Sequence, residues 1–534
     1  MRKIEFYTFL LLFLSTFSCL ATETIPTSDV PSTGSLLLEP PDFYKKNPLP
    51  INLKQALVTM LDNNLDIRIS DYDRRIAEAE IQAQKGIFDL LLSARTGVTN
   101  AEYQQPVRDM DGDPTVLKER QYYGEISLGQ LLPTGGLLSM LYSTGRTDTN
   151  SVMTNISPYY NQMAALSFTQ PFLKNFGPYV TLSGIRIAGN NARISREAFR
   201  DMVQSQVAEL TRAYWDLEFA IENYEVQRLT LRQARDLLRI TTISYKTGVL
   251  PETDVLQARA EVAAREEFVI VAESAIKAAE DYLKILMNIP RCAKDWNRFY
   301  LPMDKPEVRD IQLDTEASIR EALENRPDYH QLMLDLKNRE INRRVSWNRR
   351  LPELNFAATA GRSGLEDGHS DAWHELNTYD FHNYDFSLEL KFPLQNREAR
   401  YRYKQAALQF RQGLKQLENL ENLIILDIRN AVRNIETERK RVEATLVSVE
   451  SEKAKLDAEM KRYQVGMSTS YNVLEFQKDY STALVNHIQS KINFNKAVID
   501  LEKAKGTILS EYGILEVLDV NLTDSLEQVK QSLE

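Results

Sequence analysis

The sequence has little cysteine and lacks a long apolar segment after its N-terminus. Cys19 and Cys292 are the two cysteines, and after removal of an export signal only Cys292 would remain, which excludes an intrachain disulfide. Beyond residue 21 there is no apolar run of about 18 residues, so no bilayer-spanning helix is expected. If this chain enters a membrane, it must do so as a closed β-barrel.

Basic clusters and catalytic motifs are also missing. The net charge of -10, with no basic cluster to offset it, argues against a nucleic-acid partner. There is no Ser-His-Asp pattern, no P-loop and no zinc-protease motif, so neither catalysis nor a cofactor is expected. His369, His374 and His382 lie close together, but their spacing does not match a metal site. We interpret them as part of an exposed polar loop.

The N-terminus has the pattern of an export signal. Residues 1–21 combine Arg2 and Lys3 with an apolar stretch and a cleavage site before Thr22. Cys19 also allows lipidation, although the residues before it lack the expected leucine. Residues 22–50 are rich in Pro, Ser and Thr and indicate an extended leader.

The remaining chain is a tandem repeat. The segment from Tyr245 to Leu256, YKTGVLPETDVL, returns from Tyr463 to Leu474 as YQVGMSTSYNVL. A second similarity links Ala56-Leu57 and Asn63-Asn-Leu-Asp66 to Ala322-Leu323 and Asn325-Arg-Pro-Asp328. We divide the chain into a first repeat over 51–289, a connector over 290–313, a second repeat over 314–512 and a tail over 513–534.

Each repeat predicts a helix, strands, a very long helix, a turn and a returning helix. Residues 183–246 contain no proline, and seven apolar or aromatic residues follow a heptad pattern from Val203 to Tyr224. About 60 residues make a helix of roughly 90 Å, too long for an ordinary globular domain. The short turns at Gly248 and Gly466 require the following helices to run antiparallel. The fold class is therefore mainly α, with alternating strands near 92–101, 120–147, 163–171, 354–361 and 385–392.

The strands are too few to form a barrel within one chain. Four to six strands fall below the roughly eight that closure requires, and unpaired edges are not tolerated in lipid. A membrane protein of this kind must share one transmembrane β-barrel among several copies, continued by the helices as an α-helical tunnel.

The order of these motifs resembles the TolC-type outer membrane efflux proteins. The resemblance rests on the two halves, the Tyr-x-x-Gly turns, Tyr214-Trp215 and Gln170-Pro171, and covers roughly residues 50–512. It implies a homotrimer with a twelve-stranded barrel in the outer membrane and a helical tunnel in the periplasm. It also implies a passive duct that works with a periplasmic adaptor protein and an inner-membrane pump of the RND, ABC or MFS type.

One departure from the family pattern concerns the strands. Residues 120–147 hold two additional strand-like stretches joined by Pro133-Thr-Gly-Gly136. They form either an external hairpin or extra strands of the barrel, and we slightly favour the hairpin.

The resemblance also implies two groups of site residues. The tips of the helical hairpins would dock the adaptor, and by position these residues are Thr247, Gly248, Val249, Val465, Gly466 and Met467. The tunnel aperture corresponds to Tyr463, Asp254, Gln257, Asn472 and Glu475.

The aperture departs from the family's acidic pair. The pair retains one carboxylate, Glu475, so a trimer would carry three carboxylates there and not six. Ser468 stands where the family has a basic residue, which predicts a more readily opened tip. A simpler reading makes the glycines plain helix caps and Glu475 a solvated surface acid.

Two other functions remain open at this point. The duct could export drugs or metals, or serve as the outer membrane conduit of a type I protein secretion system. A periplasmic coiled-coil scaffold is a less favoured alternative, because a scaffold has no use for the alternating strands.

Overall fold

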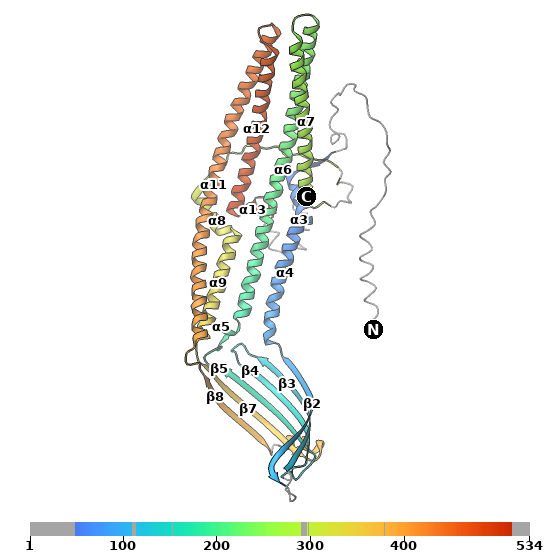
Figure 1. Ribbon diagram of the computed structural model, residues 1–534. Coiled ribbons are helices and arrows are strands. Elements are labelled where there is room, and N and C mark those ends of the chain that lie inside the picture. Colours follow the sequence, from blue (N-terminus) through green and yellow to red (C-terminus); the bar gives the residue numbers. More distant parts are fainter. Residues whose placement is uncertain are drawn as a thin grey trace, which may run out of the picture. The chain divides into compact units, whose positions relative to one another are not determined.

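The computed structural model describes residues 48–108, 114–151, 153–289, 296, 298–378 and 380–514 (Figure 1). The chain divides into two compact units. Unit 1 contains Met1–Ile69, Asp201–Arg326 and Ile424–Glu534, and unit 2 contains Ser70–Arg200 and Pro327–Leu423. Helices α4 (Leu65–Lys85), α6 (Ser183–Lys246) and α11 (Arg397–Gln464) contribute residues to both units.

Unit 2 is built on one antiparallel sheet of six strands in the order β2-β3-β4-β5-β7-β8 (Figure 1). The strands are β2 (Leu91–Arg108), β3 (Pro114–Leu131), β4 (Leu137–Thr149), β5 (Tyr159–Pro171), β7 (Glu353–Glu366) and β8 (His382–Lys391). The 3₁₀ helix η1 (Gly86–Phe88) and the short helix α5 (Pro178–Thr181) flank the sheet. Helix α9 (Pro327–Asn348) leads into β7.

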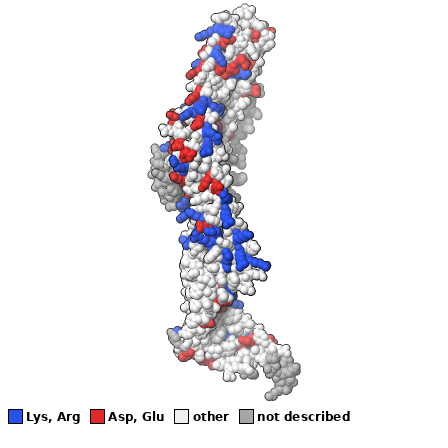
Figure 2. Space-filling view, turned by 90° about the vertical axis from the view of Figure 1, so that its left-hand side faces the viewer, with Lys and Arg blue, Asp and Glu red and all other residues white. Residues whose placement is uncertain are grey.

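The two faces of this sheet differ in chemistry. All registered pairs join residues of the same parity, so even-numbered side chains share one face across the six strands. That face carries exposed apolar side chains on every strand except β7, among them Leu92, Ile126, Met140, Leu166, Phe386 and Leu388. The odd-numbered face is mostly small and polar, with Ser93, Ser127, Ser139, Ser167 and Ser387. Figure 2 shows few charged residues over the strands and many over the helices.

Unit 1 consists mainly of long helices. It contains α3 (Leu53–Asn63), α7 (Glu252–Leu286), α8 (Thr315–Asn325), α12 (Ser470–Lys505) and α13 (Ile508–Glu511), with parts of α6 and α11. The predicted heptad side chains of α6 from Val203 to Tyr224 are all buried. The bounds of α6 are those that the sequence predicts.

Each repeat interrupts its first helix at the same place. Asn64 separates α3 from α4, and its side chain accepts hydrogen bonds from Asp66 N at 2.9 Å and Ile67 N at 3.1 Å. Its Nδ2 donates to Leu286 O at the end of α7 over 3.0 Å. Arg326, between α8 and α9, donates from Nη1 to Ala504 O near the end of α12 at 3.3 Å. The shared Asn-x-x-Asp segments are thus helix breaks that tie the first helix of each repeat to the last.

A short parallel pair anchors the connector. Strand β1 (Leu49–Ile51) pairs with β6 (Tyr300–Pro302). The buried Tyr214 hydroxyl accepts from Met303 N and Asp304 N, both at 3.2 Å, and lies 2.8 Å from Asp304 Oδ2. Burial raises the pKa of Tyr214, so the hydroxyl stays protonated.

Four expectations need correction. The first helix expected in each repeat is broken, at Asn64 and at Arg326-Pro327. The connector contains β6, and the polar loop contains helix α10 (His369–Thr378), which buries Ala372 and Leu376. The external hairpin is wrong, because β3 and β4 are inner strands of the sheet. The signal segment, Cys19 and Cys292 lie outside the described residues.

No helix within the described ranges has the length and apolar character needed to cross a membrane.

Candidate functional site at the helical tips

The first tip, Thr247-Gly248-Val249, closes α6 with a complete C-terminal capping motif. Gly248 N donates to Tyr245 O at 2.9 Å, and Val249 N donates to Ser244 O at 2.9 Å. Gly248 has φ +79°, a left-handed conformation that glycine adopts without a Cβ penalty. This pair of bonds is the Schellman motif, so the glycine is required by the turn itself.

The second tip, Val465-Gly466-Met467, repeats this geometry at the end of α11. Gly466 N donates to Tyr463 O at 3.0 Å, Met467 N donates to Arg462 O at 2.8 Å, and Gly466 has φ +74°. The Thr469 side chain then accepts from Asn472 N at 3.4 Å and caps α12. The two tips therefore share one capping geometry, although their residues differ.

The apolar side chains of the tips are not explained by capping. In a Schellman motif the residue after the glycine commonly packs back on its helix. Here Val249 is 74% exposed and Met467 is 70% exposed, while Val465 is 69% exposed. The Thr247 hydroxyl donates a hydrogen bond to Ile243 O at 3.1 Å. Both tips therefore present an apolar side chain directly after a rigid turn.

Tyr463 connects the two repeats just below the second tip. Its hydroxyl lies 3.3 Å from the Thr241 hydroxyl on α6. Its ring packs with Met460 against a cluster of Leu237, Val473 and Leu474. We predicted a role for Tyr463 from the sequence but not for Thr241, because a heptad pattern does not show which helices are neighbours.

A buried carboxylate lies beside the second tip. Glu459 is 6% exposed; its Oε2 is 3.2 Å from Arg462 Nη1, and Ser468 Oγ donates to its Oε1. Asn472 Nδ2 in turn donates to Ser468 Oγ at 3.4 Å. Ser468, which replaces the basic residue of the family pattern, therefore has a partner of its own. Glu459 and Arg462 were missed because an acid and a base three residues apart are common on any helix.

The remaining aperture residues lie in the first two turns of α7 and α12. Glu475 Oε1 pairs with Lys478 Nζ on its own helix at 3.5 Å. Asp254 is half-buried in the first turn of α7, where an acid is favoured by the helix dipole, and Gln257 is exposed. Among the described residues, no hydrogen bond or ion pair joins Glu475 or Asn472 to Asp254 or Gln257.

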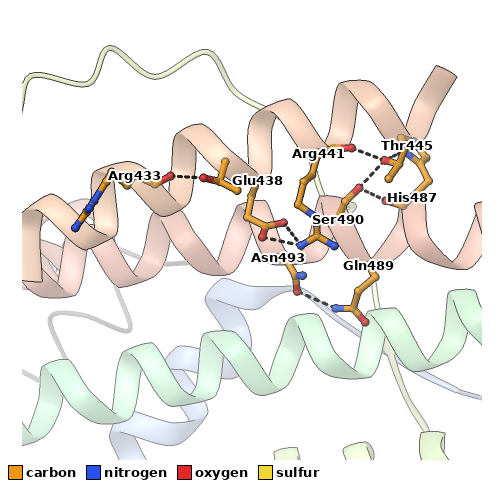
Figure 3. Close-up of polar contacts among 9 residues, drawn as sticks. Arg433, Glu438, Arg441, Thr445, His487, Gln489, Ser490 and Asn493 are labelled. Atoms are coloured by element: carbon orange, nitrogen blue, oxygen red, sulfur yellow. Dashed lines mark hydrogen bonds and ion pairs between the residues drawn. The ribbon is translucent and has the colours of Figure 1, made fainter. Parts of the chain in front are cut away.

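A buried polar contact joins α11 and α12 farther from the tips (Figure 3). Thr445 Oγ1 lies 3.1 Å from His487 Nδ1 and 2.9 Å from Ser490 Oγ. His487 is 9% exposed, and burial together with the Lys491 cation lowers its pKa. The histidine is therefore a neutral hydrogen-bonding partner between two helices.

In the part of the chain that the structure describes, no group of three or more His, Cys, Asp or Glu side chains could hold a metal ion.

Comparison with solved structures shows the same fold in outer membrane channels. The Campylobacter jejuni CmeC outer membrane channel is similar with a TM-score of 0.65 and 15% identity, over 96% of this chain and 99% of that one. CusC, described as forming a transmembrane channel, has a TM-score of 0.64 and 14% identity, over 91% and 99%. The open state of the Neisseria gonorrhoeae MtrE outer membrane channel has a TM-score of 0.61 and 15% identity, over 86% and 89%.

No curated protein sequence matches the chain. The family model described as outer membrane efflux protein matches residues 130–288 and 318–507, one segment in each repeat and more than half of the chain. The predicted resemblance is thereby confirmed: the chain belongs to the outer membrane efflux protein family.

Proposed function

We propose that this protein is the outer membrane duct of a tripartite efflux system. As a member of the family it is a transport protein and not an enzyme. In this proposal three copies assemble around one channel, with the sheets in outer membrane lipid and the helices in the periplasm. Small molecules enter the helical end from an inner-membrane pump of the RND, ABC or MFS type, through a periplasmic adaptor protein.

The observation that carries the proposal is the exposed apolar pair at the tips. Val249 and Met467 follow equivalent capped turns and point away from the protein's own core. Apolar side chains left exposed after two equivalent turns are what a docking surface for a protein partner would offer. A trimer would present six such tips, three of each kind, to the helical hairpins of an adaptor.

The aperture residues supply a gate in this proposal. The hydroxyl pair of Tyr463 and Thr241 holds the second hairpin against the first. Asn472 and Glu475 lie on one face of α12, so a trimer would form a ring with three carboxylates. The affinity of this three-carboxylate ring for blocking cations is lower than that of a six-carboxylate ring.

The experiment replaces the apolar tip side chains without disturbing the turns. Met467→Glu and Val249→Glu place a charge where an adaptor would bury an apolar group, and Met467→Leu and Val249→Ile are the matched controls. The tagged chain is purified from its native envelope, and co-purifying periplasmic and inner-membrane proteins are identified. We expect the Glu variants to lose these proteins while remaining heat-modifiable oligomers, and the controls to retain them. Equal recovery in all four variants would contradict adaptor docking at the tips.

A further inference from the structure

The six-stranded sheet has consequences for the wall of the channel. Four helices per chain connect to the sheet, since α4 leads to β2, β5 to α6, α9 to β7, and β8 to α11. Strands β3 and β4 have no such helix and are joined to each other by a short turn over 132–136. β3 and β4 are therefore additional to the four strands that each connect to a helix.

The added strands are fully incorporated in the sheet. The registered pairs between β2 and β3 run from Leu91↔Gly129 to Arg108↔Pro114, and those between β4 and β5 from Leu137↔Thr169 to Thr147↔Tyr159. Their even-numbered side chains, including Tyr122, Ile126 and Met140, continue the apolar face of β2, β5 and β8. A hairpin outside the membrane has no need for this continuity.

The turn between β3 and β4 is bonded into the junction between sheet and helices. Thr134 Oγ1 donates to Gln170 Oε1 at 2.8 Å, and Gly177 N donates to Thr134 O at 2.9 Å. A Cβ on Gly135, which has φ +89°, would come within 2.5 Å of Asn175 O. A Cβ on Gly136 would meet Gln170 Oε1 at 2.5 Å, so the Gln170 side chain that bonds Thr134 would have to move. The turn therefore fits closely at the point where β3 and β4 enter the sheet.

We propose that β2 of one copy pairs with β8 of the next, so that three copies close an eighteen-stranded barrel. This inference rests on the trimer in the proposed function. Strands β2 and β8 are the two edges of the sheet, and all ten residues of β8 are exposed. Open edges are not tolerated in lipid, and the occupant that satisfies both edges at once is a second copy of this chain.

The stagger of the sheet fits this closure. Leu91 in β2 pairs with Gly129 in β3, and the row of paired residues continues through Ser139 in β4, Ser167 in β5 and Thr359 in β7. It ends at Asp385 in β8. Asp385 is six residues from Lys391, the helix-proximal end of β8 (391 − 385 = 6). If Leu91 of the next copy lies opposite Lys391, the total stagger of three copies is about 18 residues over about 18 strands, which gives a strand tilt of about 35°. Membrane barrels have tilts of about 35–45°.

The same alignment gives a chemically matched seam. It places Leu92 of one copy opposite Leu390 of its neighbour on the apolar face. On the polar face it places Arg95 opposite Ser387, between Asp385 and Glu389. Cross-strand pairs of opposite charge stabilise an antiparallel ladder. A wall of eighteen strands is about half as wide again as one of twelve, because diameter grows roughly linearly with strand number.

Two experiments test the strand count and the seam. Electron cryo-microscopy of the full chain in lipid nanodiscs should show eighteen strands, with residues 114–149 in the wall. A twelve-stranded wall with these residues outside it would overturn the inference and leave the efflux function intact. Conversely, an eighteen-stranded trimer that binds no adaptor would retain the inference and remove the proposed function.

The seam is tested by disulfide cross-linking in a Cys292→Ser background. Ser93→Cys is combined in turn with Asp385→Cys, Ser387→Cys, Glu389→Cys or Lys391→Cys. Within one chain β2 and β8 are five strand spacings apart, about 24 Å, so only neighbouring copies can be linked. We expect reducible dimers and trimers, strongest with Glu389→Cys, and none with the opposite-face control Leu390→Cys. Absence of linked chains in all four combinations, in oligomers that remain heat-modifiable, would overturn the β2–β8 seam.

Discussion

Tyr463 on α11 and Thr241 on α6 share a hydrogen bond of 3.3 Å between their hydroxyl oxygens, and so join the two repeats beside the second tip. Thr241 also donates to Leu237 O at 2.9 Å, which leaves its oxygen free to accept from the Tyr463 hydroxyl. The pair is therefore a single defined contact between the two helical hairpins.

Removing this contact should open the tip more often. A net hydrogen bond contributes about 0.5–1.5 kcal/mol, so Tyr463→Phe or Thr241→Val should raise the ratio of open to closed channel about 2- to 12-fold. The double variant should show no further increase, because both changes remove the same bond. Single-channel recording measures the ratio, and increases that add in the double variant would contradict the assignment.

A bulky cation at Gly466 should abolish adaptor binding. Gly466→Arg introduces a Cβ at φ +74° and a charge at the apolar tip, whereas Gly466→Asn tolerates the left-handed conformation and remains neutral. We expect Gly466→Arg to form stable oligomers that no longer recover the adaptor, and Gly466→Asn to keep binding. Unchanged recovery with Gly466→Arg would remove the second tip from the docking surface.

Restoring the second carboxylate should strengthen cation block at the aperture. Asn472→Asp would raise the carboxylates in the trimeric ring from three to six, while Gln257→Glu adds the same charge to the first repeat as a comparison. We expect Asn472→Asp to lower the concentration of a trivalent cobalt hexaammine that blocks half the current by about tenfold, and Glu475→Gln to raise it. If cobalt hexaammine blocks the native channel strongly and neither substitution changes this, the cation site lies elsewhere in the channel.

Stability should fall at acidic pH because of His487. Its folded-state pKa is lowered by burial and by Lys491, so the unfolded chain binds the proton more readily. The stability contributed by neutral His487 is complete above its unfolded pKa of about 6.5 and declines as the pH falls toward the folded pKa. Thermal unfolding by circular dichroism between pH 8 and 5 should show this decline, and His487→Gln should reduce it. An identical pH dependence in that variant would assign the effect to other groups.

Tyr214→Phe should destabilise unit 1. The change removes the hydroxyl that accepts from Asp304 N and donates to Asp304 Oδ2, at a cost of about 1–3 kcal/mol, while Met303 N keeps Ile51 O as its acceptor. Tyr471→Phe, on an exposed tyrosine, is the control. A lower unfolding temperature for Tyr214→Phe alone is expected, and equal temperatures would show that water replaces the hydroxyl.

Much of the fold was predictable because long helices leave a strong periodic signal. The heptad residues of α6 and the absence of proline gave its bounds, Ser183–Lys246, and the glycines marked both turns. The breaks at Asn64 and Arg326 were missed although part of their cause is local, in the Asn64 cap and in Pro327, and part is distant. Each side chain bonds a carbonyl near the end of the last helix in its own repeat, far away in sequence.

The sheet shows the limit of local patterns. Alternation identified the stretches that became β3 and β4, but it did not state which strands they pair with. The turn between them is held by contacts distant in sequence, from Thr134 to Gln170 and to Gly177. At the tips the sequence named the exposed residues, while Glu459 became visible as a buried acid only once Ser468 and Arg462 were placed around it.

The most direct test of the proposed duct is single-channel recording of the purified full chain in planar lipid bilayers. We predict discrete ion-conducting steps from heat-modifiable trimers, and these steps become larger or longer-lived in Tyr463→Phe. Trimers that insert into the bilayer and carry no current, in both the native chain and Tyr463→Phe, would contradict it.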